Sequence, residues 1–226
     1  MKVVTRGQAL EVSARVATQV NWDAIDGDML QMQLIGLTPK EFGERFTAFL
    51  KNGGRVIAGE PKVITIDRTT LFDPAAFIGN GWSIWKGPAD GDGLTGEEEQ
   101  DKRSLASIEV DLTKVSFETM LKEGEKTVVG EEKLKRLKDA GRIRLDAKVF
   151  QTLWEDYKQY GENSTLELLR RTQGARLIDF PGTELRSPDG DRYFLSLYWQ
   201  AGEWDWSYDW LGSEWRAHYP SAVLAN

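Results

Sequence analysis

The feature that most constrains the fold is an alternating run of aromatic residues near the C-terminus. Residues 203–215 read EWDWSYDWLGSEW, with Trp204, Trp206, Tyr208 and Trp210 at every second position and small or polar residues between them. A period of two places these rings on one side of an extended strand and the intervening residues on the other. The pattern therefore predicts a half-buried strand whose rings face the core and whose polar side faces solvent.

The chain has 226 residues, of which 40% are hydrophobic, and this suits one large domain or a medium domain with a small appendage. We place a boundary near residue 70. The prediction is an α+β domain over residues 71–226, preceded by a small helical N-terminal region over residues 1–70. No apolar run is long enough for a membrane span and no secretory signal is evident, so the cytoplasm is the default location.

Three helices are predicted in the N-terminal region. The first begins at a capping box formed by Thr5 and Gln8, and the second covers residues 22–34. The third has Thr38 as N-cap and Pro39 at the first helical position, and it should end near residues 52–54.

Helices and strands are both expected after residue 70. The predicted helices are 131–140, one capped by Asp146, and one that begins at Ser164 and ends at Gly174. The predicted strands are 82–85, 105–117, 177–180, 184–186, 193–199 and the run from residue 203, with turns at Pro181-Gly182 and Ala201-Gly202.

Charge and composition exclude several functions. The net charge is −7 and the acidic excess lies after residue 70, so a phosphate backbone would be repelled and no nucleic-acid partner is expected. The chain has no cysteine, and His218 is its single histidine, which excludes thiolate chemistry and multi-histidine zinc sites. No cofactor is predicted.

Two acidic segments invite a site interpretation. The DGDG of residues 90–93, followed by three glutamates, resembles part of a calcium loop but lacks the spacing of an EF-hand, and a solvated loop is the favoured interpretation. Glu203, Asp205, Asp209 and Glu214 could supply two carboxylates to a hydrolase, although acids on an exposed strand face more often serve solubility. No catalytic residue and no metal ligand is predicted.

Segments 72–118, 130–156 and 185–226 carry a resemblance to a known family. The specific part is the ending W-x-W, W-L-G, W and P-S-A-V-L-A, and Trp85-Lys86-Gly87-Pro88 supports it. This region resembles the variable proteins of diversity-generating retroelements, of the type found in uncultivated small-genome archaea and bacteria. The resemblance implies a C-type-lectin-like fold for residues 72–226 and leaves the first 70 residues outside it.

In that family, errors at template adenines rewrite chosen codons, and the rewritten codons cannot encode Trp, Met, Lys, Glu or Gln. The resemblance thus implies that Trp199, Trp204, Trp206, Trp210 and Trp215 are framework. It also implies a variable, ligand-binding set of residues of reachable types, although Tyr208 departs from the odd-even division and could be framework. That set is Ser196, Tyr198, Ala201, Asp205, Ser207, Tyr208, Asp209, Ser213, Arg216, His218 and Tyr219.

The expected function is non-enzymatic recognition of a target, a protein or cell-surface molecule, by a diversified strand and loop surface. Exposed positions suit this role because substitutions there shift stability by less than about 0.5 kcal/mol. The alternative is a carbohydrate-binding module that uses exposed tryptophans to stack on sugar rings.

Overall fold

The computed structural model describes residues 38–40, 42–43, 46–47, 63–88 and 90–224. The chain divides into two compact units, Met1–Ile57 and Ala58–Asn226. In the first unit the described residues within 39–47 are helical, and the Phe42 N–H donates to the Thr38 carbonyl at 3.0 Å, as predicted for a helix that begins at Thr38. The helices predicted within residues 1–37 lie outside the described residues.

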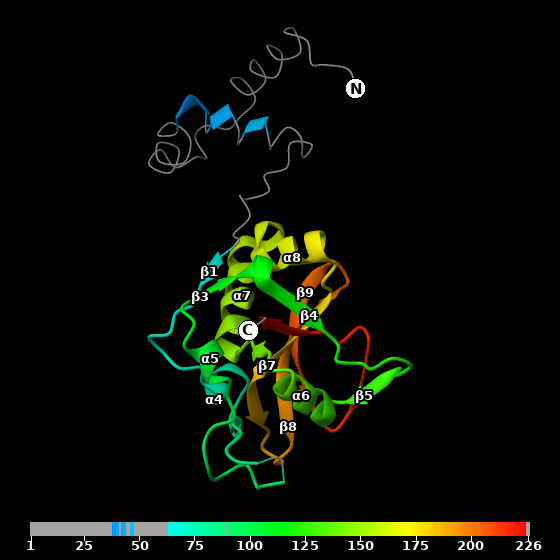
Figure 1. Cartoon of the computed structure of the whole chain (residues 1–226). Coiled ribbons are helices and arrows are strands. Elements are labelled where there is room, and N and C mark those ends of the chain that lie inside the picture. The colour runs from blue at the N-terminus through cyan, green and yellow to red at the C-terminus, as the bar shows by residue number, and fades with distance from the viewer. Residues whose placement is uncertain (1–37, 41, 44–45, 48–62, 89, 225–226) are drawn as a thin grey trace. The chain divides into compact units, whose positions relative to one another are not determined.

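The second unit is mixed α+β (Figure 1). Its helices are α4 (Pro74–Phe77), α5 (Lys102–Leu105), α6 (Gly130–Asp139), α7 (Ala147–Tyr160) and α8 (Thr165–Gln173), with 3₁₀ turns η3 (Leu112–Lys114) and η4 (Gly161–Asn163). Its strands are β1 (Val63–Thr65), β2 (Ser83–Ile84), β3 (Glu109–Asp111), β4 (Val115–Glu118), β5 (Thr127–Val129), β6 (Ile143–Arg144), β7 (Leu177–Arg186), β8 (Arg192–Gln200), β9 (Glu203–Trp210), β10 (Glu214–Arg216) and β11 (Ser221–Leu224).

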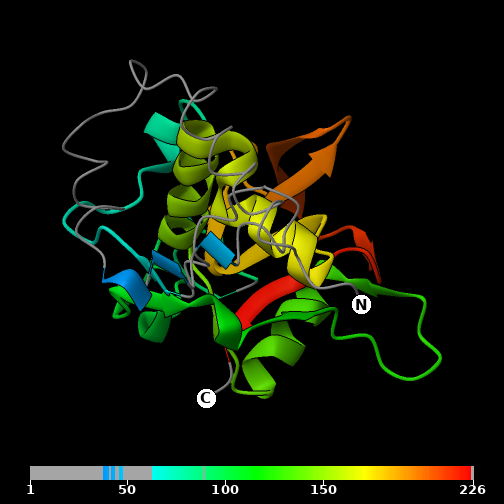
Figure 2. The same ribbon diagram turned by 90° about the horizontal axis from the view of Figure 1, so that it is seen from above.

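The main sheet runs in the order β4-β11-β7-β8-β9, with β2 paired to β7 and β6 paired to β11. β7, β8 and β9 are its longest strands and are antiparallel neighbours. Two small pairs lie outside it, β1 with β3 and β10 with β5. Figure 2 shows the β8–β9 hairpin, in orange, extending to one side of α7.

The strands β7, β8 and β9 separate two hydrophobic clusters. On one face, the Phe150 ring of α7 lies 5.4 Å from Phe180 and 6.4 Å from Trp206, measured between ring centroids. On the opposite face, the Phe194 ring lies 5.8 Å from Trp215 of β10. Because successive side chains of a strand alternate between faces, β8 contributes to both clusters.

The three helices predicted after residue 70 are confirmed as α6, α7 and α8. The Asp146 carboxylate caps α7 by accepting from the N–H groups of Lys148 and Val149. The Ser164 hydroxyl caps α8 by accepting from the Glu167 N–H at 3.3 Å. Both caps satisfy N–H groups that have no partner within the helix.

The single strand predicted over residues 105–117 is wrong. The segment forms the end of α5, then β3, the turn η3 and β4, and the two strands belong to different sheets. The Asp111 side chain accepts from the Thr113 N–H and so stabilises the turn between them. The alternation of apolar residues runs from the exposed Ile108 to the buried Leu112 without a break. The pattern therefore gave no sign of the turn.

A turn was predicted at Pro181-Gly182, but β7 continues through it as one strand. Its pairing with β8 shifts register between Phe180 and Leu185 instead. Pro181 has no N–H to donate, and proline within a sheet is tolerated at such irregularities. Gly182 is required because the backbone of residues 144–146 approaches so closely that a Cβ would overlap the Arg144 carbonyl oxygen.

The second compact unit begins at Ala58, upstream of the boundary that we placed near residue 70. The reason is that β1, within residues 63–65, pairs with β3. Among the described residues, no helix is both long and apolar enough to cross a bilayer.

We expect Gly182→Ala to lower the free energy of unfolding by at least about 2 kcal/mol, because backbone atoms cannot move aside as a flexible side chain would. Gly91→Ala is the control, since its nearest neighbour would be the Pro88 carbonyl oxygen at 3.2 Å and its φ is not positive. Urea unfolding of both variants measures the difference. Equal stability of the two variants would contradict the close approach at residue 182.

Candidate binding surface

The register between β8 and β9 assigns each residue of the hairpin to one face. Trp206 lies opposite Leu197, and Ser207 lies opposite Ser196. The rings of the alternating run therefore share a face with Leu197, and the residues between them share the other face with Ser196. The predicted alternation of aromatic and polar residues between the two faces is confirmed, but the expectation that the whole polar face is exposed is wrong, since Ser196 is 1% exposed and Asp209 Oδ2 is buried.

The aromatic face is buried at its start. Trp204 is 2% exposed, and its indole N–H donates to Glu167 of α8 at 3.0 Å. Its backbone N–H donates to the Tyr157 hydroxyl of α7 at 3.1 Å. Trp206 is half-buried, and its ring lies 4.9 Å from Phe77 of α4. These contacts attach β9 to three helices.

The expectation that all the tryptophans face the core is wrong for Trp210, which is 47% exposed. Its neighbour on the same face, Tyr208, is 42% exposed. The centroid of the Tyr208 ring lies 4.5 Å from that of Trp82 and 5.4 Å from that of Tyr193. The helix contacts of β9 are made by Trp204 and Trp206, so the row of rings continues beyond the part of the face that helices cover.

The polar face borders a cavity of about 380 Å³. This size falls within the range of small-ligand sites, about 300–1,000 Å³. Six of the eleven residues that we predicted as ligand contacts line it, and they come from β8, β9 and the loop before β11. They are Ser196, Tyr198, Ser207, Asp209, His218 and Tyr219. Ser196 is 1% exposed and forms the floor, whereas His218 is exposed.

The other five predicted contact residues do not line this cavity. Asp205 is exposed on the same face and accepts from the Tyr198 hydroxyl at 3.3 Å, and Ala201 occupies the hairpin turn with a φ of 53°. Tyr208 lies on the aromatic face. The Ser213 hydroxyl donates to the Trp210 carbonyl at 2.7 Å, and Arg216 is exposed at the end of β10.

Sequence reasoning missed three residues of the cavity wall, Arg176, Leu177 and Trp199. Leu177 pairs with Tyr198 across the β7–β8 ladder, and the Trp199 N–H donates to the Arg176 carbonyl at 2.7 Å. Only the strand register brings them to this place. Period-two alternation within β7 carried no signal for it.

A buried ionic group lies behind the cavity. The Lys133 ammonium, from α6, donates to the Asp179 carboxylate at 2.9 Å and to the Tyr219 carbonyl at 2.6 Å. It also lies 4.5 Å from the centre of the Trp215 ring. Lys133 and Asp179 are fully buried. The lysine therefore holds the loop that carries Tyr219 against the sheet.

Burial raises the pKa of two carboxyls here. The pKa of Asp179 rises to about 7, because desolvation and the negative charge of Asp209 both raise it. The positive charge of Lys133 lowers this pKa but does not cancel the rise. Burial also raises the pKa of Asp209, which the Ser196 hydroxyl and Lys133 oppose. Among the described residues, Asp209 Oδ2 and Asp179 Oδ1 are buried without a hydrogen-bond partner. Two acids thus share one buried lysine.

The cavity does not assemble the groups of a hydrolase. Asp209 is the one carboxylate among the described residues that line it, so the paired acids suggested by Glu203, Asp205 and Glu214 do not converge there. The His218 ring lies 4.6 Å from the Tyr219 ring, between centroids, at an angle of 41°, and no hydrogen bond between described residues joins His218 to Asp209 or to a cavity serine. Within the described residues, no group of three His, Asp or Glu side chains could hold a metal ion.

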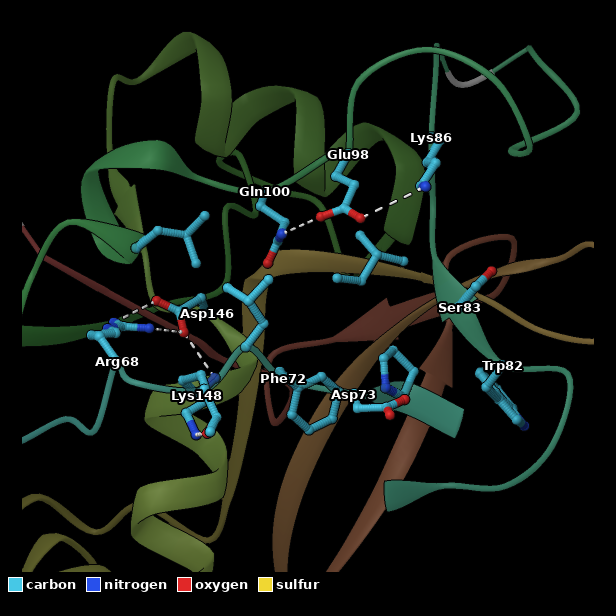
Figure 3. Close-up of a pocket in the computed structure, with 15 residues that line it drawn as sticks. Arg68, Phe72, Asp73, Trp82, Ser83, Lys86, Glu98, Gln100, Asp146 and Lys148 are labelled. Carbon is cyan, nitrogen blue, oxygen red and sulfur yellow. Dashed lines mark hydrogen bonds and ion pairs between the residues drawn. The ribbon is translucent and has the colours of Figure 1, made fainter. Parts of the chain in front are cut away.

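A larger cavity of about 550 Å³ contains none of the predicted contact residues (Figure 3). Its charged groups are paired within the protein. The Arg68 guanidinium donates to both oxygens of Asp146 at 2.9 Å, and Lys86 lies 3.9 Å from Glu98. Lys148 donates to the Thr70 hydroxyl at 3.3 Å. No group there indicates what kind of ligand would enter.

Comparison of the chain with protein-family models, curated proteins and solved structures finds no match.

We expect Trp204→Ala to lower the free energy of unfolding by about 3–5 kcal/mol, the usual cost of removing a buried aromatic side chain. Trp210→Ala, on the same strand and face, should cost less than about 1 kcal/mol because the side chain is already half in solvent. Chemical unfolding of the two variants measures both effects. Equal losses would contradict the assignment of Trp204 to the framework and Trp210 to the surface.

The raised pKa of Asp209 predicts a pH-dependent effect of Asp209→Asn. A carboxyl whose pKa is higher in the folded than in the unfolded chain costs stability as the pH rises through that range. Asparagine cannot ionise, so the variant should gain stability over wild type as the pH rises from 4 to 8. Lys133, Asp179, Arg176 and His218 are the other ionisable groups around Asp209, and they are present in both proteins. Denaturant midpoints across this range give the difference, and a gain that shrinks with pH would contradict the burial of this charge.

Proposed function

We propose that this chain is a non-enzymatic ligand-binding protein whose binding surface is the polar face of the β8–β9 hairpin and the loop that carries His218 and Tyr219. The observation that carries the proposal is the cavity on this face. Residues chosen from the sequence for their type and position converge there from three separate segments. The cavity faces away from the cluster around Phe150, on which the sheet packs.

The construction of this surface favours recognition. Tyrosine side chains supply a large contact area with few rotatable bonds, and Tyr198 and Tyr219 both line the cavity. Both ladders that flank β8 are already formed, so little backbone entropy is lost when a ligand binds. The acidic chain favours a protein or cell-surface target over a nucleic acid.

We further propose that the second unit is a C-type-lectin-like variable domain diversified by a retroelement. The support is the resemblance of residues 72–226 together with the α+β composition of this unit. The neighbouring DNA provides the test. A reverse transcriptase gene and a near-copy of the last codons, differing chiefly at adenines, are expected. An intact locus without them would refute diversification and leave ligand binding untouched.

Carbohydrate binding is a second candidate, favoured by one observation. Tyr208, Trp210, Tyr193 and Trp82 lie together on the uncovered end of the aromatic face, and Tyr193 is the Cα partner of Trp210. Exposed rings of this kind stack on the apolar faces of sugars. Trp204 does not contribute, because it is buried.

One binding experiment separates the two candidates. The full chain is screened against a random peptide display library and a glycan array, and Ser207→Tyr, which fills the cavity, is compared with Trp210→Ala. We expect Ser207→Tyr to weaken the selected ligands at least tenfold, about 1.4 kcal/mol, and Trp210→Ala to change them less than twofold. The reverse pattern would support sugar stacking and refute the cavity as the site.

A further inference from the structure

The cavity on the polar face is unevenly charged at its base. Two carboxylates, Asp179 and Asp209, lie beside a single buried cation, Lys133, which makes its hydrogen bonds to Asp179 and the Tyr219 carbonyl. The remaining negative charge sits on Asp209, which lines the cavity. An uncompensated buried charge is costly, so the site is completed by a proton or by a cation that enters from the cavity.

The walls of the cavity suit a cation as well. Tyr198, Tyr219 and His218 line the cavity together with Asp209, and aromatic faces attract ammonium and guanidinium groups. The protein already uses this interaction behind the cavity, since the Lys133 ammonium lies 4.5 Å from the centre of the Trp215 ring. The hydroxyls of Ser196 and Ser207 add hydrogen-bond acceptors at the floor.

We propose that this cavity binds the cationic side chain of an arginine or lysine in a protein ligand, with Asp209 as the charged anchor and the surrounding rings as its walls. The proposal rests on the proposed function, for which it names the ligand chemistry. Arg176, also on the cavity wall, is exposed to water, which screens its charge, so it opposes a bound cation only weakly.

The two charged residues of the wall give opposite expectations. If the ligand is cationic, Asp209→Asn weakens binding and Arg176→Gln strengthens it. If the ligand is anionic, both effects reverse. Glu203→Gln is the matched control, because Glu203 is an exposed acid of the same strand that does not line the cavity.

The probes are the capped tripeptides Ac-Gly-Arg-Gly-NH₂ and Ac-Gly-Lys-Gly-NH₂, with citrulline and Nε-acetyl-lysine versions as uncharged counterparts. Each is titrated into the ¹⁵N-labelled full chain at pH 7.5 and low salt. We expect saturable shifts of Ser207, Asp209 and Tyr219 for the charged peptides, and at least tenfold weaker binding of the uncharged ones. Asp209→Asn should weaken the charged peptides at least tenfold, Arg176→Gln should tighten them about twofold to fivefold, and Glu203→Gln should change them less than twofold.

Equal affinity for arginine and citrulline, unchanged binding to Asp209→Asn, or no saturable shift up to about 50 mM would each overturn the proposal. Thermal unfolding of Asp209→Asn ensures that any loss of binding is not a loss of folding. A library ligand that is blocked by Ser207→Tyr but contains neither lysine nor arginine, and binds Asp209→Asn normally, would refute this inference while supporting the proposed function.

Discussion

The contact of the Lys133 ammonium with the Asp179 carboxylate, the Tyr219 carbonyl and the Trp215 ring is the interaction on which the candidate surface depends. It joins α6, β7 and the segment from β10 to the loop before β11, three parts of the chain that are distant in the sequence. Removing one partner of a buried ion pair is far more costly than its net contribution suggests, since it leaves a charge without compensation. The pair therefore specifies how these three parts of the chain meet.

Around this contact the central strands serve two purposes at once. One face of β8 and β9 carries Leu197, Trp204 and Trp206, which pack on helices and fix the position of the hairpin. The other face carries Ser196, Ser207 and Asp209, which line the cavity, with Ser196 buried at its floor. Since adjacent residues point to opposite faces, a change at the partly exposed Ser207 leaves the packing of Trp206 intact. Trp204 and Trp206 thus provide stability, and the proposed function assigns specificity to the residues between the rings.

Local patterns allowed a good part of this arrangement to be predicted. The caps at Asp146 and Ser164 and the alternation through Trp204 and Trp206 depend on near neighbours in the sequence, and the structure has them as expected. What failed depends on distant contacts. The residues next to Gly182 in the sequence do not indicate that the backbone of residue 144 lies against it. Likewise, the residues next to Trp210 do not indicate that the contacts of β9 with the described helices end before it. The cavity residue Arg176 is of the same kind, since the β7–β8 pairing alone brings it to the site.

Lys133, behind the cavity, donates a hydrogen bond to the backbone carbonyl oxygen of residue 219, a group that all twenty amino acids possess. This hydrogen bond does not depend on the side chain at position 219, although the Tyr219 ring adds a contact with the Trp215 ring, and the exposed neighbour at 218 takes no part in the bond. An anchor made through the main chain keeps the path of the loop the same when the exposed side chain at position 218 is replaced.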